Sequence, residues 1–373
     1  MSLFRKAGSA AAGFTLLWAS VGTVSIASAA ETNSAPEKYT PPRTIRLEPE
    51  QPEYLNRIGI NYRMGLNISV DFRKLGGLAL SNPGPRTGSA VNRHYDDGYV
   101  LVDSSTNAGG YTWYWGYTSS NSIQGGNLAL QSDATLPNAT SNDRRDDPQS
   151  GVELTYQREL IRHKHWRAGL EAALGYTFIS IKDSRTLMNT VYRTNDAFNL
   201  NGIVPPTAPY YGGATNSAVL ISSEPSARTT EVLTGAATIT GDRSIDTHLF
   251  SIRLGPYLEI PVNERLSVFL DAGLMLAVAE TKFSFHETVA ISDPTYGIDL
   301  VSEPRSGSGS QTDFVVGGYA GGGISYALTK QLSLVGGVQF QAAGREVNHV
   351  KGKESVLDLG KSFIISMGVS YSF

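Results

Sequence analysis

The chain of 373 residues is predicted to be all-β, and one repeated pattern leads to this prediction. From Ile58 to Phe72 every even position is apolar, and the odd positions between them are glycine or polar. An α-helix would repeat every 3.6 residues, so a period of two indicates a strand with one apolar face. The same alternation returns in seven further segments. They are Gly151–Leu160, Trp166–Lys182, Asp246–Ile260, Leu266–His286, Thr312–Leu328, Leu332–Gly344 and Ser362–Phe373.

The composition excludes several classes of protein. The absence of Cys rules out a disulfide scaffold, a Cys-ligated zinc or iron–sulfur site and a Cys nucleophile. A net charge of −3 argues against a nucleic-acid partner, which normally requires a basic surface. No cofactor motif is present, and Asp96-Asp97-Gly98 lacks the spacing of an EF-hand calcium loop, so we expect neither a cofactor nor a metal.

The N-terminus has the features of a cleaved export signal. Arg5 and Lys6 precede an apolar stretch, and Ala27-Ser28-Ala29 provides the small residues of a cleavage site. We therefore assign residues 1–29 to a signal peptide. The proline-rich residues 30–56 are predicted to form a periplasmic linker, and residues 57–373 the folded domain.

The lengths of the strands and of their connections predict how the sheet is closed. Several strands reach 13–20 residues, whereas a strand needs only about 9–11 residues to cross a bilayer. The connections alternate between short links, as at Ile161–His165, and long ones, chiefly 73–150 and 183–245. Bacterial outer-membrane barrels have short periplasmic turns and long outer loops. We therefore expect a transmembrane antiparallel up-and-down β-barrel of eight strands with long extracellular loops. Ten to twelve strands are the alternative, if segments of the two longest loops join the wall.

The last predicted strand carries a second signal. Ser366, Gly368, Tyr371 and Phe373 match the pattern polar-x-Gly-x-x-aromatic-x-aromatic at the end of the chain. In this the chain resembles the outer-membrane β-barrel family, and more broadly its small eight-stranded members. The resemblance implies that these four residues form an assembly signal. It also implies insertion by the barrel-assembly machinery into the lipid of the cell outer membrane.

The phase of the alternation predicts which side chains face lipid. The apolar phase must point outward, which leaves the polar phase inside the barrel and puts Arg158 near a turn on the lipid side. Two aromatic girdles follow from this phase. They comprise Tyr156, Trp166, Tyr326, Tyr371 and Phe373 at the periplasmic side, and Phe72, Phe178, Phe250, Phe314, Phe340 and Phe363 at the outer side.

The inward phase carries charge in the first five strands, including Asp71, Glu159 and Glu259, and mainly Gly and Ser in the last three. Five of these charges are expected at one level of the barrel, as an interior layer of Arg63, Glu153, Glu171, Arg253 and Asp271. Because buried charges are costly unless they are paired, this layer predicts an ionic plug. A polar path for ions or small solutes is the alternative.

The loop 73–150 contains Tyr111, Trp113, Trp115 and Tyr117 at strand spacing. Either this aromatic face binds an extracellular ligand such as carbohydrate, or it packs the loop onto itself or onto the barrel rim. We expect a non-enzymatic barrel with a structural or surface-interaction role. A narrow porin-like channel is the first alternative. A lipid A-modifying enzyme is the second, with His248 and His286 near the outer strand ends as its candidate residues.

Overall fold

The computed structural model describes residues 54–215 and 219–373, so the predicted signal peptide lies outside the described residues, as does nearly all of the linker. Within the described residues the regular structure is β-strand, apart from two short 3₁₀ turns at Ala108–Gly110 and Ser120–Ser122. None of these described helical turns is long and apolar enough to span a membrane. The prediction of an all-β chain is confirmed.

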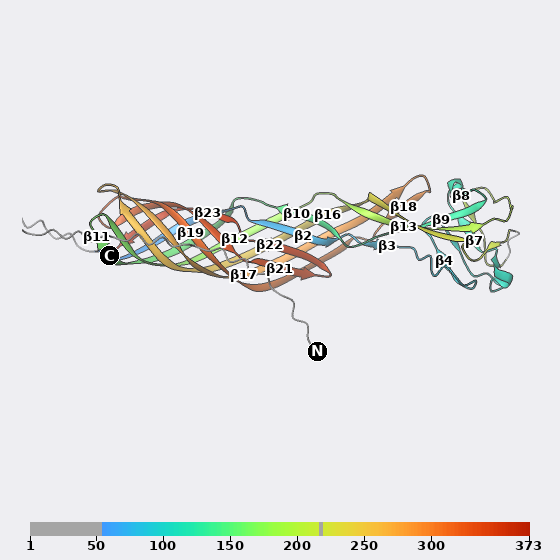
Figure 1. Cartoon of the computed structure of the whole chain (residues 1–373), viewed down its shortest axis with the longest axis horizontal. Coiled ribbons are helices and arrows are strands. Elements are labelled where there is room, and N and C mark those ends of the chain that lie inside the picture. Colours follow the sequence, from blue (N-terminus) through green and yellow to red (C-terminus); the bar gives the residue numbers. More distant parts are fainter. Residues whose placement is uncertain (1–53, 216–218) are drawn as a thin grey trace, which may run out of the picture. The chain divides into compact units, whose positions relative to one another are not determined.

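Eight strands form a closed antiparallel ring. Figure 1 shows this part of the molecule from the side. In ring order they are β1 (Asn56–Leu66), β11 (Gln149–His163), β12 (Trp166–Asp183), β16 (Ala227–Pro261), β17 (Leu266–Asp293), β19 (Arg305–Ala327), β20 (Leu332–Ala343) and β23 (Ser362–Ser372). The first and last strands pair with each other, with Ile60 opposite Val369, and this pairing closes the ring. The predicted eight-stranded up-and-down barrel is therefore confirmed. Segments of the two longest loops do form strands, but none of those in the described residues becomes a member of this ring.

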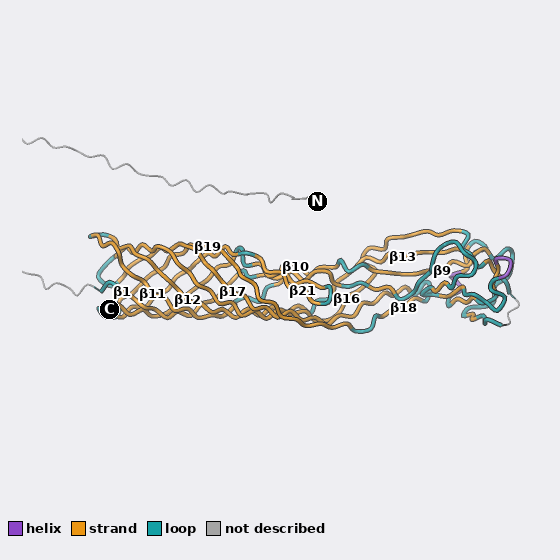
Figure 2. Tube along the Cα trace, turned by 90° about the horizontal axis from the view of Figure 1, so that it is seen from below, coloured by secondary structure: helices purple, strands orange, loops and turns teal. Residues whose placement is uncertain are grey.

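Four of the ring strands run on beyond the others. We call the part where all eight strands pair the wall, and the continuation of β12, β16, β17 and β19 the extension (Figure 2). A second sheet lies over the extension, in the order β10 (Ala139–Arg144), β2 (Ser69–Leu75), β22 (Lys353–Asp358) and β21 (Arg345–Val350). Its edge strands β10 and β21 lie beside β13 and β19 respectively.

The remaining strands form a third part, which we call the head. Here β13 (Leu187–Asn199) pairs with the far end of β16 and with β9 (Asn127–Thr135). The other strands of this part are β3 (Leu78–Ala79), β4 (Arg93–His94), β5 (Gly98–Val100), β6 (Tyr111–Thr112), β7 (Trp115–Tyr117), β8 (Ile123–Gln124), β14 (Tyr210–Tyr211), β15 (Ile221–Ser222) and β18 (Ile298–Val301).

In the wall the apolar phase faces outward, as predicted. Leu174, Leu254 and Leu270 are each about half exposed although they lie in the middle of strands. Arg158 also points outward near a turn, as its phase requires. A ring whose outer face is apolar and whose inner face is polar suits a lipid surrounding.

In the extension the alternation continues but its chemistry is reversed. Most of the inward side chains are now apolar, so that Ile181, Ile245 and Phe283 are buried. The outward side chains are polar, as at Lys182 and Lys282. Residues of β2 and β22 complete this core from the second sheet. The extension is thus built as a water-exposed protein with an apolar interior.

The predicted first strand, Ile58–Phe72, is wrong at its outer end. The ring strand ends at Leu66, and Asn67 has a left-handed backbone with φ of 61° that turns the chain away. Phe72 lies in β2, where it is fully buried and stacks on Phe283 with ring centroids 5.8 Å apart, so it is not part of a lipid-facing girdle. Asp71 does not enter the lumen. It pairs with Arg73 at 2.7 Å.

Candidate functional site

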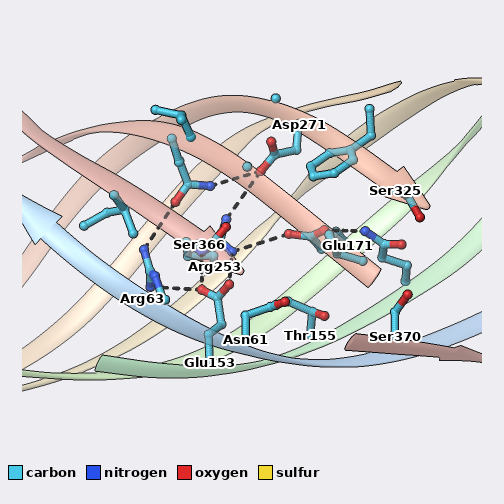
Figure 3. A pocket seen from close by; sticks show the side chains of 18 of the residues that line it. Asn61, Arg63, Glu153, Thr155, Glu171, Arg253, Asp271, Ser325, Ser366 and Ser370 are labelled. Carbon is cyan, nitrogen blue, oxygen red and sulfur yellow. Dashed lines mark hydrogen bonds and ion pairs between the residues drawn. The ribbon is translucent and has the colours of Figure 1, made fainter. Parts of the chain in front are cut away.

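The five charged residues predicted to share one level do meet inside the wall (Figure 3). Arg63 Nη1 lies 2.9 Å from Glu153 Oε2, and Arg253 Nη2 lies 2.8 Å from Glu153 Oε1. Arg253 also lies 3.5 Å from both Glu171 and Asp271. Each side chain comes from a different strand, so this ionic layer ties β1, β11, β12, β16 and β17 together across the lumen.

Neutral side chains add hydrogen bonds to the ionic layer. Gln339 of β20 accepts a hydrogen bond from Arg63 at 3.4 Å and donates one to Asp271 at 3.0 Å. Gln157 donates to Glu171 at 2.7 Å, and the Arg253 guanidinium lies over the Tyr319 ring, 4.5 Å from its centroid. Such pairing offsets the desolvation cost of burying five ionisable groups.

Glycines make room for these large side chains. A Cβ atom at Gly175 would lie 3.0 Å from Arg63 Nη1, and one at Gly321 would lie 2.8 Å from Asp271 Oδ1. The cavity that remains within the layer has a volume of about 50 Å³. A space of this size suits a few water molecules.

A second ionic contact lies nearer the short turns. Glu259 is buried and lies 3.0 Å from Arg57 and 3.3 Å from Arg167. In the other direction along β16, the apolar core of the extension begins at Leu249, four residues from Arg253. The interior is therefore filled by paired charges in the wall and mainly by apolar side chains in the extension.

The aromatic loop residues do not share one exposed face. Trp115 and Tyr117 are buried in the core of the head, where the Trp115 ring lies 4.7 Å from that of Tyr210. Trp113 is half-buried and Tyr111 is exposed. Trp115 and Tyr117 therefore pack inside the head, against residues of both long loops.

The two histidines proposed for lipid chemistry are not brought together. His248 faces outward at the outer end of the wall, where its Nδ1 lies 2.8 Å from the Tyr176 hydroxyl. It pairs across the sheet with Glu280, six residues from His286 on β17, a distance of about 20 Å along a strand. Among the described residues no group of His, Asp and Glu is arranged to hold a metal ion.

The four residues of the expected assembly signal lie on β23 and at the chain end. Tyr371 and Phe373 are exposed on the outer face, with ring centroids 6.5 Å apart. Gly368 lies where the strands approach closely, because a Cβ there would be 2.0 Å from the Ile60 carbonyl oxygen. Ser366 lines the lumen. Their role in assembly stays a prediction.

Two buried carboxyl groups outside the wall have no cation beside them in the described structure. Asp97 in the head accepts hydrogen bonds from the backbone N–H of Gln131 at 2.8 Å and from the Ser122 hydroxyl at 3.1 Å. Burial raises its pKa to about 7. Glu346 of β21 accepts from the Thr281 hydroxyl at 2.8 Å, and burial raises its pKa to about 7 as well.

Comparison with known proteins finds similarity only among solved structures. No family model and no curated protein matches the chain. Ail, the attachment invasion locus protein of Yersinia pestis, is 10% identical with a TM-score of 0.26, over 86% of this chain and 99% of that one. The outer membrane protease OmpT from Escherichia coli is 11% identical with a TM-score of 0.30, over 86% and 97%. The outer membrane protein OprG from Pseudomonas aeruginosa is 10% identical with a TM-score of 0.26, over 84% and 96%.

The class of the protein follows from the ring itself. Eight antiparallel strands close without an edge, their outer face is apolar, and their lumen is polar. This is the fold of the outer-membrane β-barrels, as the sequence predicts.

Proposed function

We propose that the chain is an exported outer-membrane protein whose wall is a closed anchor, and whose extension and head make contacts outside the cell. The observation that carries this proposal is the filled interior. Paired charges close the wall, and an apolar core closes the extension beyond it. A barrel blocked at two successive levels suits anchoring better than solute passage.

The reach of the strands supports the surface role. β16 continues 23 residues beyond Phe250, from Leu249 to Ala227, which corresponds to about 75 Å of strand. Placing the short turns in the periplasm, as is usual for this fold, puts the extension and the head outside. This arrangement would present the head well beyond the lipid surface. The chain acts in this proposal as a binding and display protein and has no catalytic role.

Conductance measurements separate this proposal from the porin-like alternative. The folded chain, reconstituted into a planar lipid bilayer, is expected to give no current steps. The double variant Arg253→Ala with Glu153→Ala should also be silent, because the apolar core of the extension remains in place. Insertion is verified in parallel by vesicle flotation and by heat-modifiable gel mobility. Stable, voltage-tolerant steps from the wild-type chain would contradict the closed anchor.

The outer-membrane part of the proposal has its own test. Deletion of Phe373 removes the terminal aromatic residue of the expected assembly signal and should sharply lower the amount of folded barrel in the outer-membrane fraction. Phe340→Leu is the matched control, since it changes another outward aromatic side chain of the wall. Normal levels of the heat-modifiable form after the deletion would count against the assignment.

A further inference from the structure

A cavity on the extension is lined by several positively charged side chains and is separate from the ionic layer of the wall. Its volume is about 450 Å³. Three cationic side chains line it, Arg305, Lys351 and Lys353, and no carboxylate is among the described lining residues. Phe285 provides an aromatic surface beside them. The cavity is of the size of small-molecule sites, which occupy about 300–1,000 Å³, and is far larger than a single inorganic anion needs.

Two of the three cations are held in place by hydrogen-bond acceptors of the protein. The buried Glu287 carboxylate lies 2.7 Å from Lys353 Nζ and 3.0 Å from Arg305 Nη2. The Gly76 carbonyl oxygen accepts from Lys353 at 2.8 Å and from Arg305 at 3.2 Å. One carboxylate is thus shared between two cations, and Lys351 adds a third. The group keeps an excess of two positive charges when all four are ionised.

The cations retain donors for a ligand. An ammonium group has three N–H donors and a guanidinium has five. Lys353 uses two donors on Glu287 and Gly76, and Lys351 uses one on the Ser306 carbonyl oxygen at 2.8 Å. Lys353 is more than nine-tenths buried, so its position is set before any ligand arrives.

The backbone around the cavity also leaves room for a ligand to approach closely. Gly76 and Gly352 line it with φ of 77° and 80°, a left-handed conformation that favours glycine. At Gly352 the space that a side chain would occupy is empty. A bulky ligand can therefore lie against the turn between β21 and β22.

We propose that this cavity binds a phosphate or sulfate ester carried on a small organic group such as a sugar ring. The cations suit the tetrahedral oxyanion, and the remaining volume with Phe285 suits the ring. Arg305 lies nine residues from the girdle residue Phe314 on β19, about 30 Å along the strand. The ligand therefore comes from the water phase, and not from headgroups at the lipid interface.

Titration calorimetry on the folded full chain in detergent tests this site. The probes are glucose 6-phosphate, glucose 6-sulfate, inorganic phosphate and glucose. At least one sugar ester should bind more tightly than inorganic phosphate, and glucose should not bind. The stronger of the two esters identifies the anion, and its binding should weaken as NaCl is raised. Equal binding of inorganic phosphate and both esters would overturn the organic part of the proposal. No binding of any anion at millimolar concentration would overturn all of it.

Matched variants locate the binding. Lys351→Gln should weaken it about tenfold, as expected for one charge-assisted hydrogen bond. Arg305→Gln should weaken it similarly, since Lys353 still pairs with Glu287. Lys330→Gln removes the same charge at an exposed short turn and should have no effect. Equal affinities for Lys351→Gln and Lys330→Gln would overturn the site. Because these measurements do not depend on conductance, their failure is distinguishable from failure of the proposed closed anchor.

Discussion

The wall and the extension are made from the same strands but have opposite interiors. On β17 the wall presents Leu270 and Leu274 outward, at 52% and 70% exposure, while Asp271 faces the lumen. Further along the same strand Phe283 is fully buried, and Lys282 beside it points outward. The pairing with β16 and β19 runs across this change without a shift in register between residues 274 and 287.

This difference shows that the surroundings, and not the strand geometry, decide which face is apolar. A strand presents alternate side chains to opposite faces whatever lies outside. In lipid the outer face must be apolar, whereas in water the interior must be. On β17 the apolar side chains change from the outer to the inner face between Leu276 and Ala279. This change therefore marks where the sheet leaves the membrane.

The largest effect is expected from a change in the extension core. Phe283→Ala removes a fully buried ring that stacks on Phe72, and should destabilise the extension by about 3–5 kcal/mol. Lys282→Ala, at the adjacent exposed position, should stay within about 0.5 kcal/mol. Denaturant dependence of protease cleavage measures both. Equal stability of the two variants would mean that the extension has no such core.

A charge placed on the outer face should distinguish the two regions. Leu270→Arg in the wall should cost about 2–4 kcal/mol, because the side chain faces the hydrocarbon of the bilayer. Ser308→Arg is the counterpart on the outer face of the extension and should cost about 0.5 kcal/mol or less. Both are measured by reversible unfolding in lipid vesicles. A neutral Leu270→Arg would show that the facing of the wall is inverted.

A smaller, pH-dependent effect is expected in the head, where Asp97 is buried without a cation. Its pKa is about 7 in the folded chain and about 4 in an unfolded one. The folded state then binds more protons between these values, so stability falls as pH rises from about 4 to about 7 and is constant above. The slope is at most about 1.4 kcal/mol per pH unit.

Asp97→Asn should remove this slope while retaining an acceptor for the backbone N–H of Gln131. Asp299→Asn, at an exposed position of β18, should not change it. Hydrogen exchange of β9 between pH 5 and pH 8, corrected for intrinsic rates, measures the difference. A wild-type slope that persists in Asp97→Asn would assign the pH dependence to another group.

The sequence predicts the ring and the ionic layer well because both follow from the alternation and from residue counts along each strand. Arg63, Glu153 and Arg253 follow from counting residues along alternating strands, and the structure brings them together. The extension is not among the predicted features, although the sequence contains the change of apolar phase that produces it. Phe283 and Phe285 occupy odd positions in a segment whose earlier large apolar residues are mostly even.

Two other features depend on contacts that a local pattern does not contain. The departure of the first strand rests on a single left-handed residue, Asn67, while the alternation itself continues into β2. The burial of Trp115 depends on Tyr210 and Ile221, which come from a different long connection. Local periodicity indicates a strand, but it does not indicate which distant segment covers one of its faces.

The most direct test of the reversed interior is a spin-label scan along β17. Because the chain has no Cys, each Cys introduced between Val268 and Val289 carries the only label. In lipid vesicles, labels at even positions up to 276 should be accessible to oxygen, and those at even positions from 280 should be accessible to a water-soluble nickel reagent. Labels at odd positions from 279 should be accessible to neither. Nickel access at positions 283 and 285, or oxygen-dominated access at 282 and 286, would contradict the account.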